Sequence, residues 1–168
     1  MDAAELRAMQ APIKERYKSA AGAALITLKA KGTLDDQSIA CKVETGRALA
    51  VAGLHPATGG SGLELCSGDM LLEALVACAG VTLRAVSTSL GILVRSGRVL
   101  AEGDLDFRGT LAVDRGAPVG VREIRLSFDL PSVPDEELAT LLKLTERYCV
   151  VYQTLAGGPT LSASITTG

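Results

Sequence analysis

The sequence contains no tryptophan, and aromatic residues of all kinds make up only 3% of its 168 residues. Proteins that bind single-stranded nucleic acid stack bases on aromatic side chains, so a base-stacking surface is excluded. The sequence also has no excess of basic residues. It contains 17 Lys and Arg and 19 Asp and Glu, which gives a net charge of −2. Binding to nucleic acid or to an anionic membrane requires a basic patch, so we expect neither partner.

The residue spacing typical of a metal site is missing as well. The chain has a single histidine, His55, and its four cysteines, Cys41, Cys66, Cys78 and Cys149, form no CxxC pair. Structural zinc is held by four clustered ligands, often supplied in such pairs. We therefore expect no metal or other cofactor. A hydrolase that pairs a cysteine with a histidine stays open, although His55 lies in a His-Pro step beside a glycine-rich loop.

Long apolar runs are absent too. The first residues lack the apolar segment of a secretory signal. The longest apolar stretch, 70–83, is interrupted by Glu73 and is shorter than the roughly 20 residues that span a bilayer. We therefore predict a cytoplasmic protein, in which the cysteines begin as thiols because that compartment is reducing.

The composition is sufficient for one packed domain, since 48% of the residues are hydrophobic. Residues 2–20 predict a polar helical arm in which Pro12 breaks or restarts the helix. Three short strands are expected next, with a turn at Asp35 and Asp36 after the first of them. Their ranges are 23–30, 39–43 and 47–54.

The segment 67–90 predicts one long helix, with Ser67 as its N-cap and Gly91 just beyond its C-terminal end. It contains only three charged residues. A helix that is apolar on every face is expected to be buried.

The rest of the chain predicts more strands and a second helix. The strands are expected over 93–103, 105–113, 121–130 and 161–166, and the helix over 135–148. This order is typical of an α+β fold with antiparallel strands. A sheet of this size cannot cover an apolar helix on both faces, so a homodimer that buries the remaining face is expected.

Two cysteines stand where either a core residue or a reactive thiol is reasonable. Cys78 lies in the middle of the apolar helix, and a free cysteine often fills a core as a small hydrophobic residue. Cys149 lies at the end of the second helix beside charged residues, which is less typical of a core position.

The segments SGDMLLEALVACAGVTLRAV (67–86) and LTERYCVVYQTL (144–155) are similar to paired motifs of one family. They resemble the osmotically inducible protein C / organic hydroperoxide resistance (OsmC/Ohr) family. The resemblance implies an intertwined α+β homodimer, with antiparallel sheets around two long central helices. It places the OsmC-like domain at 21–168 and makes 1–20 an N-terminal helical extension.

The resemblance also implies a chemistry, the thiol-dependent reduction of organic hydroperoxides without metal or flavin. Cys78 would be the peroxidatic thiol, Cys149 the resolving thiol, and a cellular dithiol the reductant. In this family an arginine held by a carboxylate activates the thiol, and the candidates here are Arg47 and Asp69. Asp69 precedes Cys78 by nine residues, about 900° of helix rotation, so only an intermediate cation could link them.

The chain departs from the family pattern at three points. Its first hairpin, KAKGTLDDQ, contains no arginine, and Val150 stands where the family has a proline after the second cysteine. Cys66 is an additional thiol and an alternative resolving partner. These departures leave two other hypotheses open: a non-catalytic dimer that binds a small apolar or thiol-reactive ligand, and a redox sensor whose N-terminal arm recruits a partner.

Overall fold

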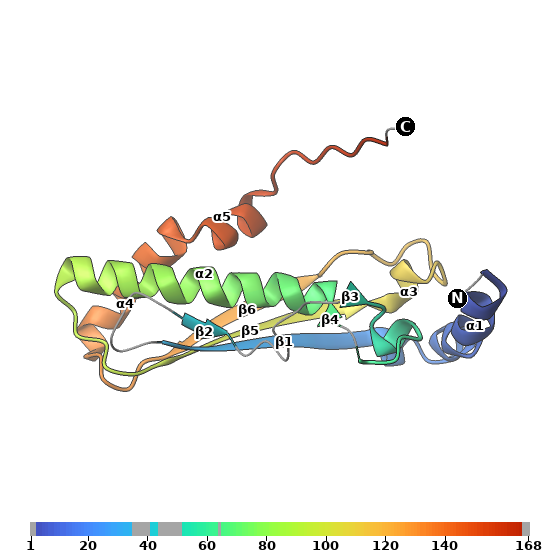
Figure 1. The fold of residues 1–168 in the computed structure, drawn as a ribbon, viewed down its shortest axis with the longest axis horizontal. Coiled ribbons are helices and arrows are strands. Elements are labelled where there is room, and N and C mark those ends of the chain that lie inside the picture. The colour runs from blue at the N-terminus through green and yellow to red at the C-terminus, as the bar shows by residue number, and fades with distance from the viewer. Residues whose placement is uncertain (1–2, 35–40, 44–51, 64, 166–168) are drawn as a thin grey trace.

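The computed structural model describes residues 3–34, 41–43, 52–63 and 65–165. A four-stranded antiparallel sheet with the strand order β2-β1-β5-β6 forms its base. The long helix α2 lies along one face of this sheet and contacts β1 and β5 (Figure 1). The predicted α+β class is therefore confirmed.

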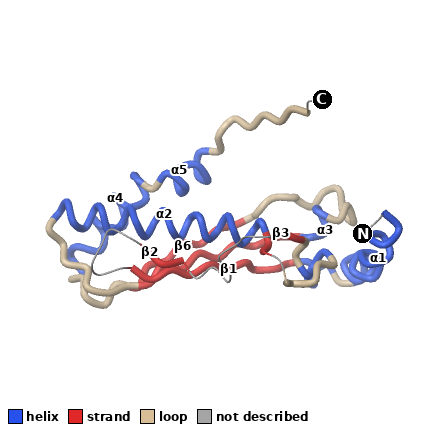
Figure 2. Tube along the Cα trace, in the orientation of Figure 1, coloured by secondary structure: helices blue, strands red, loops and turns tan. Residues whose placement is uncertain are grey.

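The helices and strands alternate in an irregular order along the chain (Figure 2). The bounds of these elements, where η denotes a 3-10 helix, are α1 (Ala3–Ser19), η1 (Ala21–Ala24), β1 (Leu25–Leu34), β2 (Cys41–Val43), β3 (Ala52–Gly53), η2 (Pro56–Thr58), β4 (Leu65–Cys66), α2 (Ser67–Leu90), β5 (Arg98–Asp106), α3 (Phe107–Thr110), β6 (Glu123–Asp129), α4 (Asp135–Tyr148) and α5 (Val150–Gly157).

The first hairpin is confirmed, because β1 and β2 pair antiparallel with Gly32 opposite Val43. The turn predicted at Asp35 and Asp36 lies outside the described residues. Of the strand predicted over 47–54, only residues 52–54 are described, and β3 within them pairs with β4 in parallel.

The prediction of two strands over 93–103 and 105–113 is wrong. One strand, β5, runs through the expected break, and the chain then turns into the short helix α3. The turn is local in origin: a carboxylate oxygen of Asp106 accepts a hydrogen bond from the Arg108 N–H at 3.1 Å and caps α3. Such side-chain capping competes with continued strand pairing.

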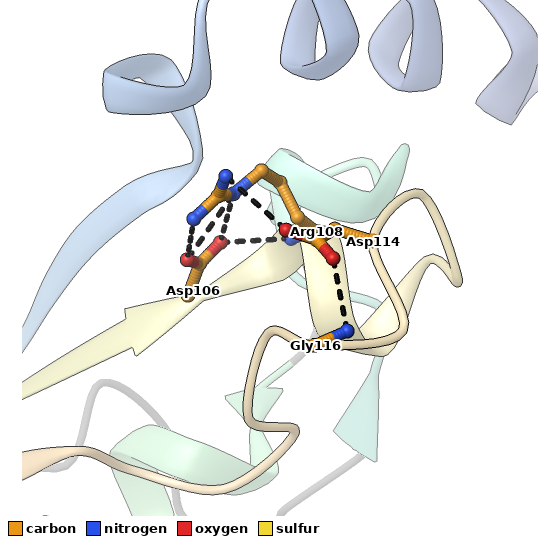
Figure 3. A network of polar contacts seen from close by, with 4 residues as sticks. All are labelled: Asp106, Arg108, Asp114 and Gly116. Carbon is orange, nitrogen blue, oxygen red and sulfur yellow. Dashed lines mark hydrogen bonds and ion pairs between the residues drawn. The ribbon is translucent and has the colours of Figure 1, made fainter.

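A polar network holds this turn in place (Figure 3). Asp106 is 1% exposed, and its Oδ2 lies 2.6 Å from a guanidinium nitrogen of Arg108. Hydrogen bonds from Arg108 hold the pKa of Asp106 below its usual range, against the effect of burial. Arg108 also lies 3.5 Å from Asp114, which accepts a hydrogen bond from the Gly116 N–H. A buried carboxylate is thus paired and hydrogen-bonded, as its burial requires.

The helix α2 ends as predicted, since Gly91 follows it with φ +71° and donates its N–H to carbonyls of the last turn. Its burial is one-sided, however. Leu72, Leu75 and Leu83 are buried, whereas Val81 is 40% exposed. By length and composition alone α2 could cross a membrane. Half of the residues in its most apolar 18-residue stretch are buried inside the protein, however, as in the core helix of a globular protein.

The helix α1 runs through Pro12, so the predicted break at that residue is wrong. Its last turn carries Tyr17, which is 1% exposed and belongs to the hydrophobic core. The Tyr17 hydroxyl donates a hydrogen bond to the Ala57 carbonyl at 2.7 Å. This contact fixes α1 to η2, in the loop that precedes α2.

The C-terminal region contains an element that the sequence did not predict. Helix α4 has its expected bounds and contacts α2, but a further helix, α5, follows it directly. Helix α5 lies on the side of α2 that faces away from the sheet (Figure 1). Residues 161–165 form no strand, so the prediction of one there is wrong.

Candidate active site

The structure brings Cys78 and Cys149 together. Cys78 lies in the middle of α2 and is partly exposed, whereas Cys149 is fully buried at the junction of α4 and α5. Both are free thiols in this structure. Their side chains are hydrogen-bonded to each other, although 71 positions separate them in the sequence (149 − 78).

Cys149 both closes one helix and opens the next. Its N–H donates to the Thr145 carbonyl at 2.9 Å, and its own carbonyl accepts from the Gln153 N–H at 2.9 Å. Its backbone is extended, with φ −73° and ψ 109°, so the two helices are not continuous. The Sγ atom accepts a hydrogen bond from the Tyr152 N–H at 3.4 Å, which caps α5 and holds the thiol inside the junction.

The two thiols have opposite electrostatic environments. Burial raises the pKa of Cys78, but hydrogen bonds from the Val151 N–H, the Cys149 thiol, the Thr82 hydroxyl and the Val150 N–H together bring it below its usual value. Burial raises the pKa of Cys149 to about 11, and the neighbouring Cys78 adds to this effect. Of the two thiols, Cys78 is therefore the one that ionises at the lower pH, whereas Cys149 keeps its proton, a division of the kind that separates nucleophile from proton donor.

Thr82 and the two valine N–H groups are site components that the sequence analysis missed. A spacing of four residues places Thr82 on the same face of α2 as Cys78, and this spacing was a usable signal. The valine N–H groups gave no such signal, because the start of α5 was not predicted.

Two open grooves lie along α2, one lined by a residue that precedes Cys78 in the helix and the other by residues that follow it, and Cys78 itself lines neither. One of about 370 Å³ is lined by residues of α2, β6, α4 and α5, including Leu75, Leu155 and Tyr152. The other, of about 380 Å³, is lined by residues that include Thr82 and Tyr148. Leu75 lines the first groove and Tyr148 the second.

The structure does not bring Asp69 to the thiols. Asp69 lies in the first turn of α2, where burial raises its pKa and the charge of His55 partly opposes that effect. Arg47 lies outside the described residues. Cys66 precedes the first residue of α2, so it and not Ser67 is the N-cap, and its side chain makes no capping hydrogen bond.

Within the described ranges, no three His, Cys, Asp or Glu side chains cluster in a way that could hold a metal ion. In the described part of the site, the groups around the Cys78 sulfur are the Cys149 thiol, the Thr82 hydroxyl and the backbone N–H groups of Val150 and Val151.

Comparisons with known proteins identify the family and the fold of this chain. The sequence model of the OsmC-like protein family matches residues 59–164, a segment that contains both Cys78 and Cys149. A crystal structure of an OsmC-like hydroperoxide resistance protein from Jannaschia sp. CCS1 has the same fold, with a TM-score of 0.61 at 16% identity, covering 86% of this chain and 95% of that one. No curated protein matches the sequence significantly. Because the family match covers more than half of the chain, the protein belongs to the OsmC-like family.

Proposed function

We propose that the protein is a cysteine-based peroxidase that reduces organic hydroperoxides in oxidative stress defence, with Cys78 as the attacking thiol and Cys149 as the resolving thiol. The observation that carries this proposal is the contact between the two thiols in opposite environments. A lowered pKa and partial exposure mark a reactive cysteine, whereas a raised pKa and full burial mark a protected one.

In the first step the Cys78 thiolate attacks the terminal oxygen of the hydroperoxide. The S–O bond forms, the O–O bond breaks, and the alkoxide takes up a proton and leaves as the alcohol. The sulfur is oxidised to a sulfenic acid and the peroxide is reduced by the same two electrons. The Thr82 hydroxyl and the N–H groups that stabilise the thiolate remain as donors to the new oxygen.

In the second step Cys149 attacks the Cys78 sulfur. The S–S bond forms, the S–O bond breaks, and hydroxide leaves as water with the Cys149 proton. Ionised Cys78 helps to raise the pKa of Cys149. Oxidation to a neutral sulfenic acid removes that charge, so Cys149 ionises more readily once it is needed. A cytoplasmic dithiol then reduces the bridge by exchange and is itself oxidised to a disulfide.

The groove of about 370 Å³ along α2 supports an organic hydroperoxide as the substrate. Its wall contains leucine side chains from four elements, Leu75, Leu126, Leu142 and Leu155, together with the charged residues Arg122, Glu123 and Glu146. The leucines of such a wall bind an alkyl or aryl group through the hydrophobic effect, which does not favour hydrogen peroxide.

We propose a homodimer in which a second copy covers the outer side of α2. Val81 and Leu71 on α2 are 40% and 38% exposed, and Tyr148 and Val150 near α5 are 58% and 70% exposed. Helix α5 buries none of its residues in this single chain. Exposed apolar residues on adjoining elements are typical of an interface, and a self-complementary patch gives a closed dimer.

The test uses reduced protein, one equivalent of cumene hydroperoxide and disulfide mapping by mass spectrometry. A rapid Cys78–Cys149 bridge with stoichiometric release of the alcohol is expected. Cys78→Ser should abolish peroxide consumption, and Cys149→Ser should give one turnover and a trapped sulfenic acid. Cys66→Ser is the matched control and should leave the bridge unchanged. Unreacted thiols in the wild-type protein would contradict the proposal.

The second candidate is a non-catalytic dimer that binds a small apolar or thiol-reactive ligand, and the same groove favours it. Its outcome in this experiment is distinct, because a binder leaves the hydroperoxide intact. Equilibrium dialysis with cumyl alcohol would then show retention of the ligand by the unreacted protein.

A further inference from the structure

The start of α5 leaves two backbone N–H groups without a carbonyl partner inside their own helix. The first helical hydrogen bond of α5 runs from the Gln153 N–H to the Cys149 carbonyl, and the Tyr152 N–H donates to the Cys149 Sγ. The N–H groups of Val150 and Val151 precede both of these bonds, as the first N–H groups of any helix do.

These two N–H groups face α2. Helix α5 packs against α2, and the Val150 and Val151 N–H groups are hydrogen-bonded to the Cys78 sulfur. The extended conformation of Cys149 turns the chain at this point, so that the open end of α5 and the capped thiol of Cys149 meet Cys78 together.

We propose that the first turn of α5 is the element that stabilises the thiolate of this site, with the N–H groups of Val150 and Val151 holding the ionised sulfur of Cys78. The positive end of the helix dipole points the same way and adds to the effect. Neither group is a side-chain cation, and neither can be recognised by residue type.

The proposal deepens the proposed function by naming what activates its nucleophile, but its measurement is independent of catalysis. The ionisation of Cys78 is read from the rate at which iodoacetamide alkylates it across a range of pH, with the modified peptide quantified by mass spectrometry. Only the thiolate reacts, so the midpoint of the profile reports the pKa of Cys78.

Val150→Pro removes one N–H group and little else. Proline is well accepted at the first position of a helix, where its φ is already suitable. The residue before a proline must be extended, and Cys149 already is, with ψ 109°. The Val150 side chain is 70% exposed in the single chain, and any dimer contact that it makes is lost in both Val150→Pro and Val150→Ala. Val150→Ala, which keeps the N–H, is the matched control.

Val150→Pro is expected to raise the midpoint of Cys78 alkylation by roughly one pH unit, the size of one hydrogen bond to a charged group. Val150→Ala is expected to leave the midpoint unchanged. Equal midpoints in the two variants would overturn the proposal, as would a shift in Arg47→Ala with none in Val150→Pro.

A second measurement covers the case in which Val150→Pro fails to fold. In the wild-type protein, the amide proton shifts of Val150 and Val151 should titrate with the alkylation midpoint of Cys78, and Cys78→Ser should abolish this titration. Amide proton shifts of Val150 and Val151 that do not change around the alkylation midpoint of Cys78 would overturn the proposal. A protein that passes these tests but consumes no hydroperoxide would refute the proposed function alone.

Discussion

The Cys149 thiol donates a hydrogen bond to the Cys78 sulfur across the contact between α2 and the α4–α5 junction. This one relationship separates the two thiols chemically. Cys78 gains stabilisation of its charged form, and Cys149 is held in its neutral form by burial and by its neighbour. This pair and the contacts that hold the surrounding fold lead to five predictions.

The two thiols should react in a fixed order as the pH rises. Iodoacetamide should modify Cys78 at a lower pH than it modifies the same cysteine in the unfolded chain, because the pKa of Cys78 is lowered. Cys149 should react in the native protein only as the pH approaches about 11. Peptide-resolved alkylation measures both profiles, and denatured protein, in which the two thiols react alike, is the control. Earlier alkylation of Cys149 would contradict the assignment.

The same pair sets a limit on stability at high pH. Because the folded-state pKa of Cys149 is raised, the stabilisation from its neutral thiol is fully present below the pKa of the unfolded chain, and it is lost as the pH rises through about 11. Urea unfolding across alkaline pH should show this loss in the wild-type protein. Cys149→Ala should show a smaller decline, and an equal decline would exclude Cys149 as its cause.

Thr82→Val should raise the pKa of Cys78, because the Thr82 hydroxyl hydrogen-bonds to the sulfur and valine has the same shape without the donor. A rise of roughly one pH unit is expected from the loss of one hydrogen bond to a charged group. Thr82→Ser keeps the hydroxyl and should behave as the wild type. The alkylation profile of Cys78 is the readout, and indistinguishable profiles for the two variants would refute the role of the hydroxyl.

Asp106→Ala should lower the free energy of unfolding by about 2–3 kcal/mol, because it removes both the cap of α3 and the acceptor for Arg108. In the wild type this contribution is present above about pH 3.9 and is lost as the pH falls through the lowered pKa of Asp106. Asp129→Ala, at an exposed position of β6, is the control and should change stability by less than about 0.5 kcal/mol. Equal urea midpoints for the two variants would show that the network adds no stability.

Tyr17→Phe should cost about 1 kcal/mol, since the buried hydroxyl donates to the Ala57 carbonyl and phenylalanine leaves that carbonyl without this donor. Tyr148→Phe removes an exposed hydroxyl and serves as the control. Thermal unfolding compares the two. Equal midpoints would mean that packing alone, without this hydrogen bond, fixes α1 to η2.

Much of the fold could be predicted because local signals agreed with tertiary structure. Alternation of apolar and polar residues identified β6, where Ile124 and Phe128 are partly buried and Glu123 is exposed. Helical periodicity identified α4, and Gly91 marked the end of α2 through its left-handed conformation. The prediction failed at Asp106, where a side-chain cap ends β5, and over 150–157, where β-branched residues gave no helical signal.

The sequence by itself determined the family, through the motifs around Cys78 and Cys149, and it identified these two cysteines as the candidates for the proposed chemistry. Only the tertiary structure decided how the pKa values of the two thiols differ. The α4–α5 junction buries Cys149 and turns the N–H groups of Val150 and Val151 toward Cys78, so the pKa of Cys78 is lowered while that of Cys149 is raised. Backbone N–H groups are the same in every residue except proline, and their effect depends on where the chain points them. That direction is set by the packing of α5 on α2, which no local pattern encodes.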